Sequence, residues 1–171
     1  MSTTKGFTLI ELLIVIVLIA VITGMAMLSM GTADPRDQQK QEAERLVKLL
    51  ELGRQEAITR GDSLGLELFT QGYRFAVIRK QKWQTETSDM VFRPRSLMPK
   101  LQLVLLMEKK NIILKREPIE SVDPQPQIIL TPDGDMDLFE LSMNLTDGDS
   151  RFVVSHNQQD GLVVISAENK P

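Results

Sequence analysis

The hydropathy pattern is dominated by an apolar run near the amino terminus. Between Phe7 and Met30 the only charged residue is Glu11, and fourteen of the residues from Phe7 to Leu28 are Leu, Ile, Val or Phe. A helix of about 24 residues is roughly 36 Å long, and the hydrocarbon core of a bilayer is about 30 Å thick. The pattern therefore predicts a membrane-spanning helix over residues 7–30.

Glu11 would lie inside this apolar region, where a charge is costly. Insertion scales assign about 2.5–3.5 kcal/mol to a central Asp, Lys or Arg. The fourteen large apolar residues each return about 0.3–0.6 kcal/mol, so a sum of roughly 4–8 kcal/mol keeps insertion favourable. An ionisable residue within a membrane usually has a function and a partner. The simplest partner for Glu11 is the free amine that cleavage of the Gly6–Phe7 bond would create, on this chain or a neighbouring copy.

A second helix is predicted from Asp37 to about Arg60. Its apolar residues recur at i, i+3, i+4 and i+7, and we expect this stripe to pack against the chain's own domain. The break at Asp34-Pro35 either kinks one helix or supplies the N-cap and first residue of a new one. Gly61 offers the left-handed conformation that commonly ends helices. The stripe consists of Ala43, Leu46, Val47, Leu50, Ala57 and Ile58.

Beyond Gly61 the apolar period changes to two, which is typical of strands. A hairpin is expected over 64–68 and 73–78, and a closing hairpin over 151–155 and 162–166. We also expect 127–131 to pair with 137–144 through a turn at Asp133-Gly134. Roughly eight short antiparallel strands following helices indicate an α+β fold. The remaining strand-like runs are 101–107 and 111–115.

Composition excludes several classes of function. The chain has 171 residues, enough for one domain beyond the apolar run. Its net charge of −3 and pI near 5.3 provide no basic field for nucleic acid. It has no cysteine, and its single histidine, His156, lies in a polar stretch that we interpret as a solvated loop. No serine has the context of a catalytic triad, so we expect no catalytic residue and no cofactor.

One acidic turn is a candidate metal site. Asp133, Asp135 and Asp137 alternate around Gly134, with Glu140 nearby. Oxygen ligands at such spacing can hold calcium, but the twelve-residue EF-hand spacing is not met. The sequence leaves calcium binding open, and we expect an acidic β-turn without a metal.

Basic residues cluster along the first predicted hairpin. They are most simply a solvated strand face, with a partner-docking patch as the alternative. Tyr73 and Trp83, in the same stretch, are expected to be core or edge aromatics. The basic residues are Arg74, Arg79, Lys80 and Lys82.

The segment Lys5-Gly6-Phe7-Thr8-Leu9-Ile10-Glu11 resembles, without a gap, the amino-terminal signal of type IV pilins and type II secretion pseudopilins. The resemblance implies that a prepilin peptidase cuts after Gly6 and methylates the new terminal amine of Phe7. It also implies that Glu11 pairs with the terminal amine of an adjacent subunit during filament assembly.

The same resemblance implies a pilin-like domain organisation in a Gram-negative bacterium. Lys5 is the sole positive charge before the apolar run, which favours a cytoplasmic amino terminus, and the resemblance places the carboxy-terminal domain in the periplasm. The implied partners are other major and minor pseudopilins of one filament, the prepilin peptidase, the inner-membrane assembly platform and the lipid bilayer. The expected segments are a leader, 1–6; a transmembrane and assembly helix, 7–30; a periplasmic continuation of that helix, 31–60; and a periplasmic β-rich domain, 61–171.

Further matches narrow the resemblance to the minor pseudopilin H family of type II secretion. They run over most of the chain and imply a structural subunit rather than an enzyme. The matching residues are Gly61, Gly65, Tyr73-Arg74-Phe75, Trp83, Pro126-Gln127-Ile128-Ile129-Leu130, Gly134 and Phe139.

Several alternatives stay open at this point. A secretory signal peptide could be cleaved after Gly31-Thr32-Ala33, although its apolar region would be too long and Glu11 disfavours it. The run could be a plain membrane anchor with a chance glutamate. The chain could also be a minor pilin of a type IV pilus or DNA-uptake system. A membrane-anchored periplasmic enzyme would need a clustered nucleophile, base or metal set, and none is evident.

Overall fold

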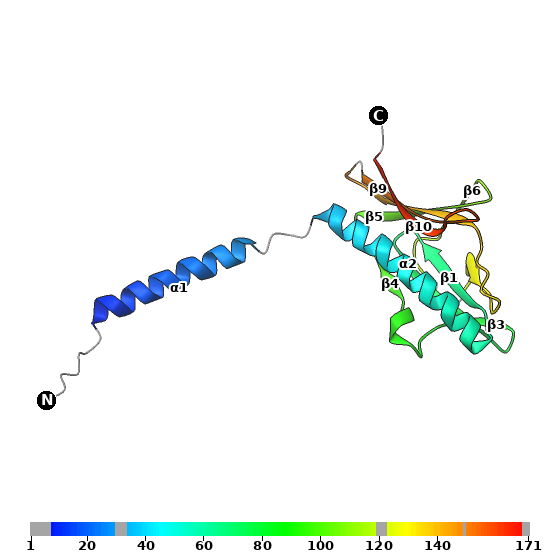
Figure 1. Ribbon diagram of the computed structural model, residues 1–171, viewed down its shortest axis with the longest axis horizontal. Helices are drawn as coiled ribbons and strands as arrows, with labels where there is room; N and C mark the ends of the chain where they lie inside the picture. The colour runs from blue at the N-terminus through cyan, green and yellow to red at the C-terminus, as the bar shows by residue number, and fades with distance from the viewer. Residues whose placement is uncertain (1–7, 30–33, 119–122, 149, 169–171) are drawn as a thin grey trace. The chain divides into compact units, whose positions relative to one another are not determined.

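The computed structural model describes residues 8–29, 34–118, 123–148 and 150–168. The chain divides into two units, Met1–Asp34 and Pro35–Pro171. Within the first unit the described residues form one helix, α1 (Leu9–Ser29; Figure 1). Its large apolar side chains from Leu9 to Met25 are exposed. Nowhere in the described residues is a helix both long and apolar enough to cross a membrane. The predicted range 7–30 includes Phe7 and Met30, which lie outside those residues.

The second unit is organised around the helix α2 (Pro35–Arg60). Pro35 is its first residue, a position where the missing N–H costs nothing. Gly61 follows the helix at φ +70°, and its N–H donates to the Ala57 carbonyl at 2.9 Å, as the predicted stop requires. The predicted segment 31–60 is therefore helical from Pro35 onward, and residues 30–33 lie outside the described chain.

One face of α2 is buried, and most of the predicted stripe lies on it. The prediction that Ile58 belongs to the packed stripe is wrong. Its side chain is 51% exposed and contacts the turn at Gly134 instead of the core. Ile58 follows the buried Ala57 by one residue and therefore lies about 100° around the helix from it, at the edge of the buried face. The buried residues of α2 are Gln39, Ala43, Leu46, Leu49, Leu50, Gly53 and Ala57.

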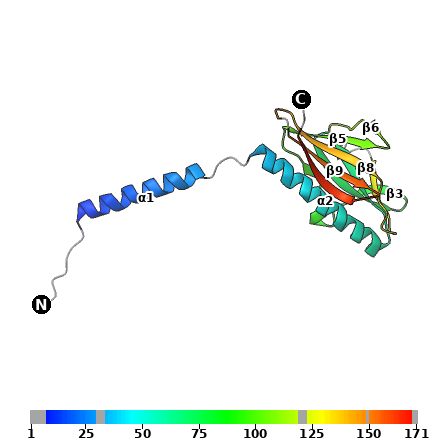
Figure 2. The ribbon, with the colours of Figure 1, turned by 45° about the horizontal axis from the view of Figure 1, so that its top comes forward.

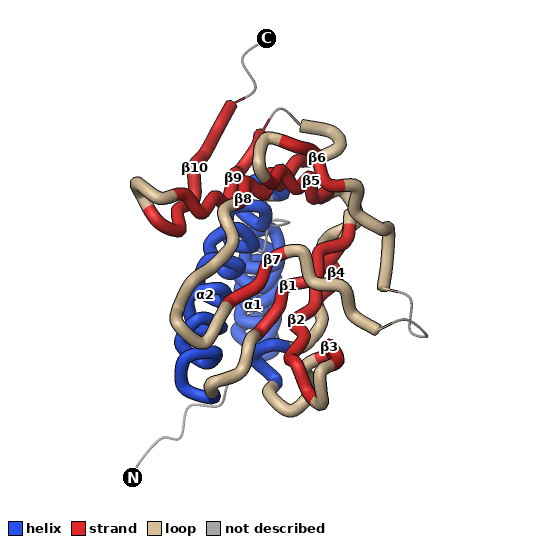
Figure 3. Tube along the Cα trace, turned by 90° about the vertical axis from the view of Figure 1, so that its right-hand side faces the viewer, coloured by secondary structure: helices blue, strands red, loops and turns tan. Residues whose placement is uncertain are grey.

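Two antiparallel sheets pack with α2 (Figure 2, Figure 3). The first sheet has the order β3-β2-β1-β7, with β4 beside β2, and the second has the order β10-β9-β8-β5-β6. The first sheet consists of β1 (Leu64–Phe69), β2 (Gly72–Arg79), β3 (Lys82–Thr85), β4 (Arg95–Ser96) and β7 (Ile128–Leu130). The second consists of β5 (Leu101–Met107), β6 (Lys110–Ile112), β8 (Phe139–Leu145), β9 (Ser150–Asn157) and β10 (Gly161–Glu168). A 3₁₀ turn, η1 (Met90–Phe92), lies between β3 and β4.

The two predicted hairpins are present. β1 pairs with β2 through a two-residue connection, with Phe69 opposite Gly72. β9 pairs with β10 from Asn157 opposite Gly161 onward, and Gly161 has a φ of +69°. In both cases alternating apolar residues and a turn signal lie next to each other in the sequence, so pairing and register are local properties.

The predicted pairing of 127–131 with 137–144 is wrong. β7 pairs with β1 in the first sheet, whereas β8 pairs with β5 and β9 in the second. The turn at Gly134 does form, at φ +88°, but only one bridge, Leu130 to Met136, joins its two sides. Ile128 and Leu130 are fully buried, and their place is beside Leu64 and Leu66 under α2.

A single core joins α2 to both sheets. Leu46 and Leu50 of the helix are fully buried with Leu66 of the first sheet and Leu141 of the second. Edge-to-face aromatic contacts strengthen this core, with ring centroids 5.0 Å apart between Phe75 and Phe92. The fold is thus α+β, with helices followed by antiparallel sheets, as the sequence predicts.

A buried amide ties the first turns of α2 to the second sheet. The Gln39 side chain is fully buried, and its Nε2 donates to the carbonyls of Met143, at 2.7 Å, and Ser150, at 3.1 Å. The Ser150 hydroxyl donates back to Gln39 Oε1 at 2.7 Å. All these polar groups would lose water on burial, so the network satisfies them together.

We expect Gln39→Ala to lower the free energy of unfolding by about 1–3 kcal/mol, because it removes three hydrogen bonds from a buried site. The measurement is urea unfolding of the full chain in non-ionic detergent. Gln41→Ala is the matched control: Gln41 is exposed on the same helix, and its replacement should change stability by less than about 0.5 kcal/mol. Equal effects of the two variants would contradict this role of Gln39.

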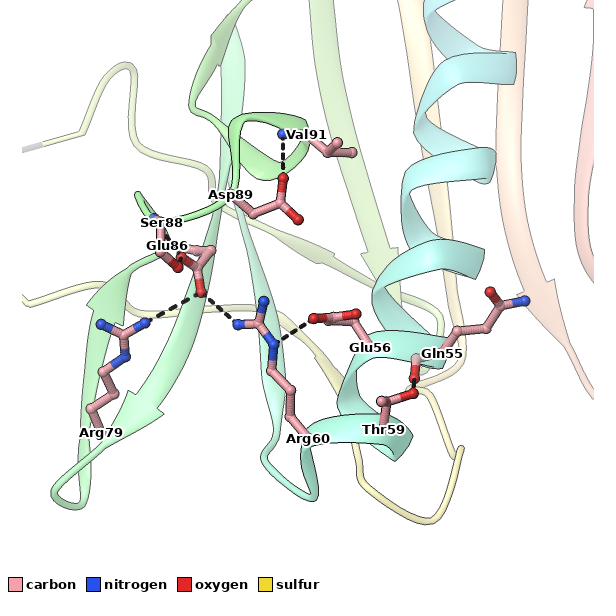
Figure 4. Close-up of polar contacts among 9 residues, drawn as sticks. All are labelled: Gln55, Glu56, Thr59, Arg60, Arg79, Glu86, Ser88, Asp89 and Val91. Carbon is pink, nitrogen blue, oxygen red and sulfur yellow. Dashed lines mark hydrogen bonds and ion pairs between the residues drawn. The ribbon is translucent and has the colours of Figure 1, made fainter.

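A buried carboxylate holds the other end of α2 (Figure 4). The Glu86 side chain is fully buried, and its Oε2 lies 3.1 Å from Arg60 Nη1 and 3.7 Å from Arg79 Nη2. Its Oε1 accepts from the Ser88 N–H at 2.7 Å and from the Ser88 hydroxyl. Burial alone would raise the pKa of Glu86, but the Ser88 hydrogen bonds and the two guanidinium charges outweigh it, so the pKa is lowered.

This lowered pKa makes folding sensitive to acid. The stabilising contribution of Glu86 is complete above the ordinary glutamate pKa of 4.5 and is lost as the pH falls through the lower folded-state value. We expect Glu86→Gln to lower stability at pH 7 by about 2 kcal/mol and to flatten the loss of stability below pH 4.5. Urea unfolding at a series of pH values measures both. Glu44→Gln, at an exposed pair with Lys40, should leave the pH profile unchanged.

Candidate functional site

The residues that begin α1 form a capping box. The Thr8 N–H and the Thr8 hydroxyl both donate to Glu11 Oε2, each at 3.2 Å, and the Glu11 N–H donates to Thr8 Oγ1 at 3.4 Å. The Thr8 carbonyl accepts the first helical bond, from the Leu12 N–H at 3.3 Å. Thr8 is therefore the N-cap and Glu11 the third helical residue, the arrangement in which two side chains satisfy each other's backbone donors.

This cap gives Glu11 a local role that the sequence analysis missed. The signal was present, since Thr8-Leu9-Ile10-Glu11 matches the Thr-x-x-Glu pattern of a capping box. A carboxylate in the first turn also complements the positive end of the helix dipole. The other two predicted site residues, Gly6 and Phe7, lie outside the described residues.

Behind the cap, α1 presents apolar side chains on every side. Leu9 is 89% exposed and Ile10 is 68% exposed, and the large apolar residues continue through Met25. Thr23, the polar residue of this stretch, turns its hydroxyl inward to the Ile19 carbonyl at 2.7 Å. Such a surface, apolar all round, is typical of a helix that is buried by lipid or by other helices.

The acidic turn uses its groups for hydrogen bonds within the chain. Asp137 Oδ2 accepts from the Ile129 N–H at 2.8 Å, and the Asp135 carbonyl accepts from the Thr131 N–H at 2.9 Å. Within the described ranges no group of three or more His, Cys, Asp or Glu residues is arranged to hold a metal ion. Asp135 and Asp137 thus hold the turn against β7 through these hydrogen bonds.

The prediction that His156 lies in a solvated loop is wrong. His156 lies at the end of β9 and is half-buried. Its Nδ1 lies 3.0 Å from the Asp137 carbonyl oxygen, and its ring lies beside Phe139 with centroids 6.5 Å apart. The loop part of the polar stretch is the β9–β10 turn, residues 158–160, which begins after Asn157.

The basic residues of the first hairpin do not share one solvated face. Arg74 is buried, with Nε 2.6 Å from Glu67 Oε2 and its guanidinium carbon 5.6 Å from the centre of the Phe69 ring. Every residue of β1 is buried, and so are the first six residues of its partner strand β2, so both faces of this pair are covered at Arg74. Lys80, by contrast, lies exposed in the β2–β3 turn.

Two family profiles match the sequence. The profile described as the prokaryotic N-terminal methylation motif matches residues 1–27, and that of type II transport protein GspH matches residues 42–166. The chain belongs to the GspH family. It is a minor pseudopilin of type II secretion, a structural class, and this removes the enzyme alternative.

Curated relatives agree with this assignment. The type II secretion system protein H of Pseudomonas aeruginosa is 29% identical over 148 residues, with 84% of each chain covered. The protein of the same name from Aeromonas hydrophila is 26% identical over 158 residues, covering 87% of this chain and 85% of that protein.

Solved structures show the same fold. The minor pseudopilin EpsH from the type II secretion system of Vibrio cholerae has a TM-score of 0.66 at 23% identity, over 81% of this chain and 99% of that chain. The solution structure of GspH of E. coli has a TM-score of 0.60 at 20% identity, over 83% of this chain and 99% of that chain. Family membership together with the methylation motif implies a prepilin of the inner membrane and periplasm, with pseudopilin partners.

We expect Thr8→Ala to weaken the first turn of α1 by about 1 kcal/mol, because it removes the hydroxyl that serves both sides of the cap. Amide hydrogen exchange of the full chain in detergent micelles should then be about fivefold faster in the first turn. Thr23→Ala, within the same helix, is the control and should leave those amides unchanged. Equal protection in wild type and Thr8→Ala would show that the box does not hold the helix end.

Proposed function

We propose that the chain is made as a precursor that is cut after Gly6 and methylated at Phe7. The observation that carries this proposal is the methylation-motif match over residues 1–27, a range that includes most of the exposed, apolar α1. Residues 1–6 then serve as the leader peptide, and the mature chain begins one residue before the Thr8 cap. The new amine would lie close to the positive end of the helix dipole, where it needs a carboxylate.

We further propose that residues 7–30 anchor the subunit in the inner membrane before assembly, with residues 61–171 in the periplasm. The support is the continuous apolar surface of α1 from Leu9 to Met25. Assembly then replaces lipid by the equivalent helices of other major and minor pseudopilins, without exposing this surface to water. The prepilin peptidase and the inner-membrane assembly platform are the other partners in this scheme.

In this proposal Glu11 exchanges one partner for another. Alone, its carboxylate is held by the Thr8 N–H and hydroxyl, a cap worth about 1 kcal/mol. An amine about 4 Å from the carboxylate attracts it by about 4 kcal/mol at an effective dielectric of about 20, before desolvation. The Phe7 amine of a neighbouring subunit would therefore displace the cap, and the ion pair would set the register between helices.

Mass spectrometry of the amino-terminal peptide from membrane-purified protein tests the processing. We expect N-methylated Phe7 as the first residue, and an uncleaved precursor from Gly6→Leu, because a bulky side chain blocks the peptidase. A terminus near Asp34 would instead indicate signal-peptide cleavage. An intact Met1 or Ser2 in cells with active prepilin peptidase would make the segment a plain anchor.

Three variants separate the charge of Glu11 from its capping role. Glu11→Gln retains a capping residue but loses the charge, Glu11→Ala loses both, and Thr8→Ala loses the cap while keeping the charge. We expect all three to be inserted and cleaved. The two Glu11 variants should lose most co-purification with other pseudopilins, whereas Thr8→Ala should retain it. Normal secretion and co-purification with Glu11→Gln would exclude the ion pair.

A further inference from the structure

A recess in the second unit collects arginines from three separate parts of the chain. We call it the arginine cleft. It has a volume of about 390 Å³ and lies where β2 and β4 pair, side by side in Figure 3. Its arginines are Arg74 from β2, Arg95 from β4 and Arg116 from the segment after β6. A smaller hollow of about 230 Å³ adjoins it, shares Arg95, and adds Arg45 and Arg93.

The acids of this region do not neutralise its arginines. Among lining residues the two hollows together hold five arginines and two glutamates, in a chain whose net charge is −3. Glu42 is already engaged, because it accepts from the Tyr73 hydroxyl at 2.7 Å and from Arg45. Burial, together with the Glu42 charge, raises the pKa of Tyr73 far above its usual value, so this hydroxyl stays a donor.

Three of the five arginines have no ion-pair partner within the described residues. Arg74 is paired with Glu67 and Arg45 with Glu42, whereas Arg93, Arg95 and Arg116 form no salt bridge there. Arg95 is the most confined of the three: its Nε is buried and has no hydrogen-bond partner in the described chain. A buried N–H without a partner costs about 1–3 kcal/mol, which an acceptor entering from the cleft would recover.

The walls of the cleft also select the kind of acceptor. Phe69, Leu97 and Pro99 line it beside the arginines, so it offers apolar contact as well as charge. Its volume is within the range of pockets that enclose several groups of a ligand, and exceeds what one small anion fills. A flat bilayer surface cannot enter a recess, and an extended peptide can. Guanidinium groups bind carboxylates through two parallel hydrogen bonds, which favours Asp and Glu side chains.

We propose that the arginine cleft binds an acidic peptide segment of another protein, with carboxylates at Arg95 and Arg116 and an adjacent apolar side chain against Leu97 and Pro99. This interaction surface lies entirely in the second unit. It is therefore additional to the assembly site at the amino terminus and does not depend on Glu11.

The test is binding of the full chain, in non-ionic detergent micelles, to an array of random hexapeptides. We expect the bound peptides to be enriched in Asp and Glu next to an apolar residue. Arg95→Gln and Arg116→Gln should each weaken the selected peptides about tenfold or more, since each leaves a carboxylate without its partner. Binding should also weaken as salt increases, because the contacts are ionic.

Arg54→Gln is the matched control. Arg54 is exposed on α2, lines neither hollow, and its loss changes the net charge by the same amount. The affinity of the Arg54→Gln variant for the selected peptides should equal that of wild type. Thermal unfolding checks that each variant folds. The Arg116 side chain is exposed, so Arg116→Gln should fold normally even if Arg95→Gln does not.

Four results would overturn the proposal. One is the absence of acidic enrichment among bound peptides, and another is unchanged binding by the Arg95→Gln, Arg116→Gln double variant. Saturable binding of inorganic phosphate itself, to wild type but not to the double variant, without any selection of acidic peptides would assign the cleft to a phosphate ligand. A concentration-dependent dimer in sedimentation that Arg95→Gln abolishes would assign it to a second copy of this chain.

Discussion

The buried face of α2 is the contact on which both sheets depend. Leu46 and Leu50 lie in one core with the inner residues of β1 and β8, which belong to different sheets. Among the described residues of the second unit, α2 is the only α-helix that covers the apolar faces of the sheets, and small sheets need such cover to be stable in water. Polar anchors then fix the helix at its two ends, through Gln39 at the first and Arg60 at the second.

Local features of the sequence were sufficient for part of this fold. The period-two runs and turn residues predict the β1–β2 and β9–β10 hairpins, and Gly61 predicts the end of α2. The pairing of β7 with β1 was not predictable in the same way, because it joins residues about sixty positions apart through buried packing. The burial of Arg74 has the same origin: its partner Glu67 and the Phe69 ring are arranged by the pairing of two strands.

The two candidate sites differ in how visible they are in the sequence. The proposed amino-terminal site is a contiguous motif, so Gly6, Phe7 and Glu11 can be predicted from their order alone. The capping contacts of Thr8 depend on where the helix begins, and the long apolar run does not mark that position in the sequence. The arginine cleft combines residues from β2, β4 and the segment after β6, and nothing in the spacing of Arg74, Arg95 and Arg116 predicts that they share one recess. Of the basic residues along the first hairpin that the sequence singles out, only Arg74 lines the cleft.

The core of the second unit has one more consequence, for the way this sequence can change over generations. Every described residue of that core comes from Ala43 onward. Exchanges among Leu, Ile and Val in α1 therefore leave these core residues unchanged. In the proposed assembly, such exchanges are constrained by the helices of other subunits, whereas changes in the second unit are constrained by the packing around α2.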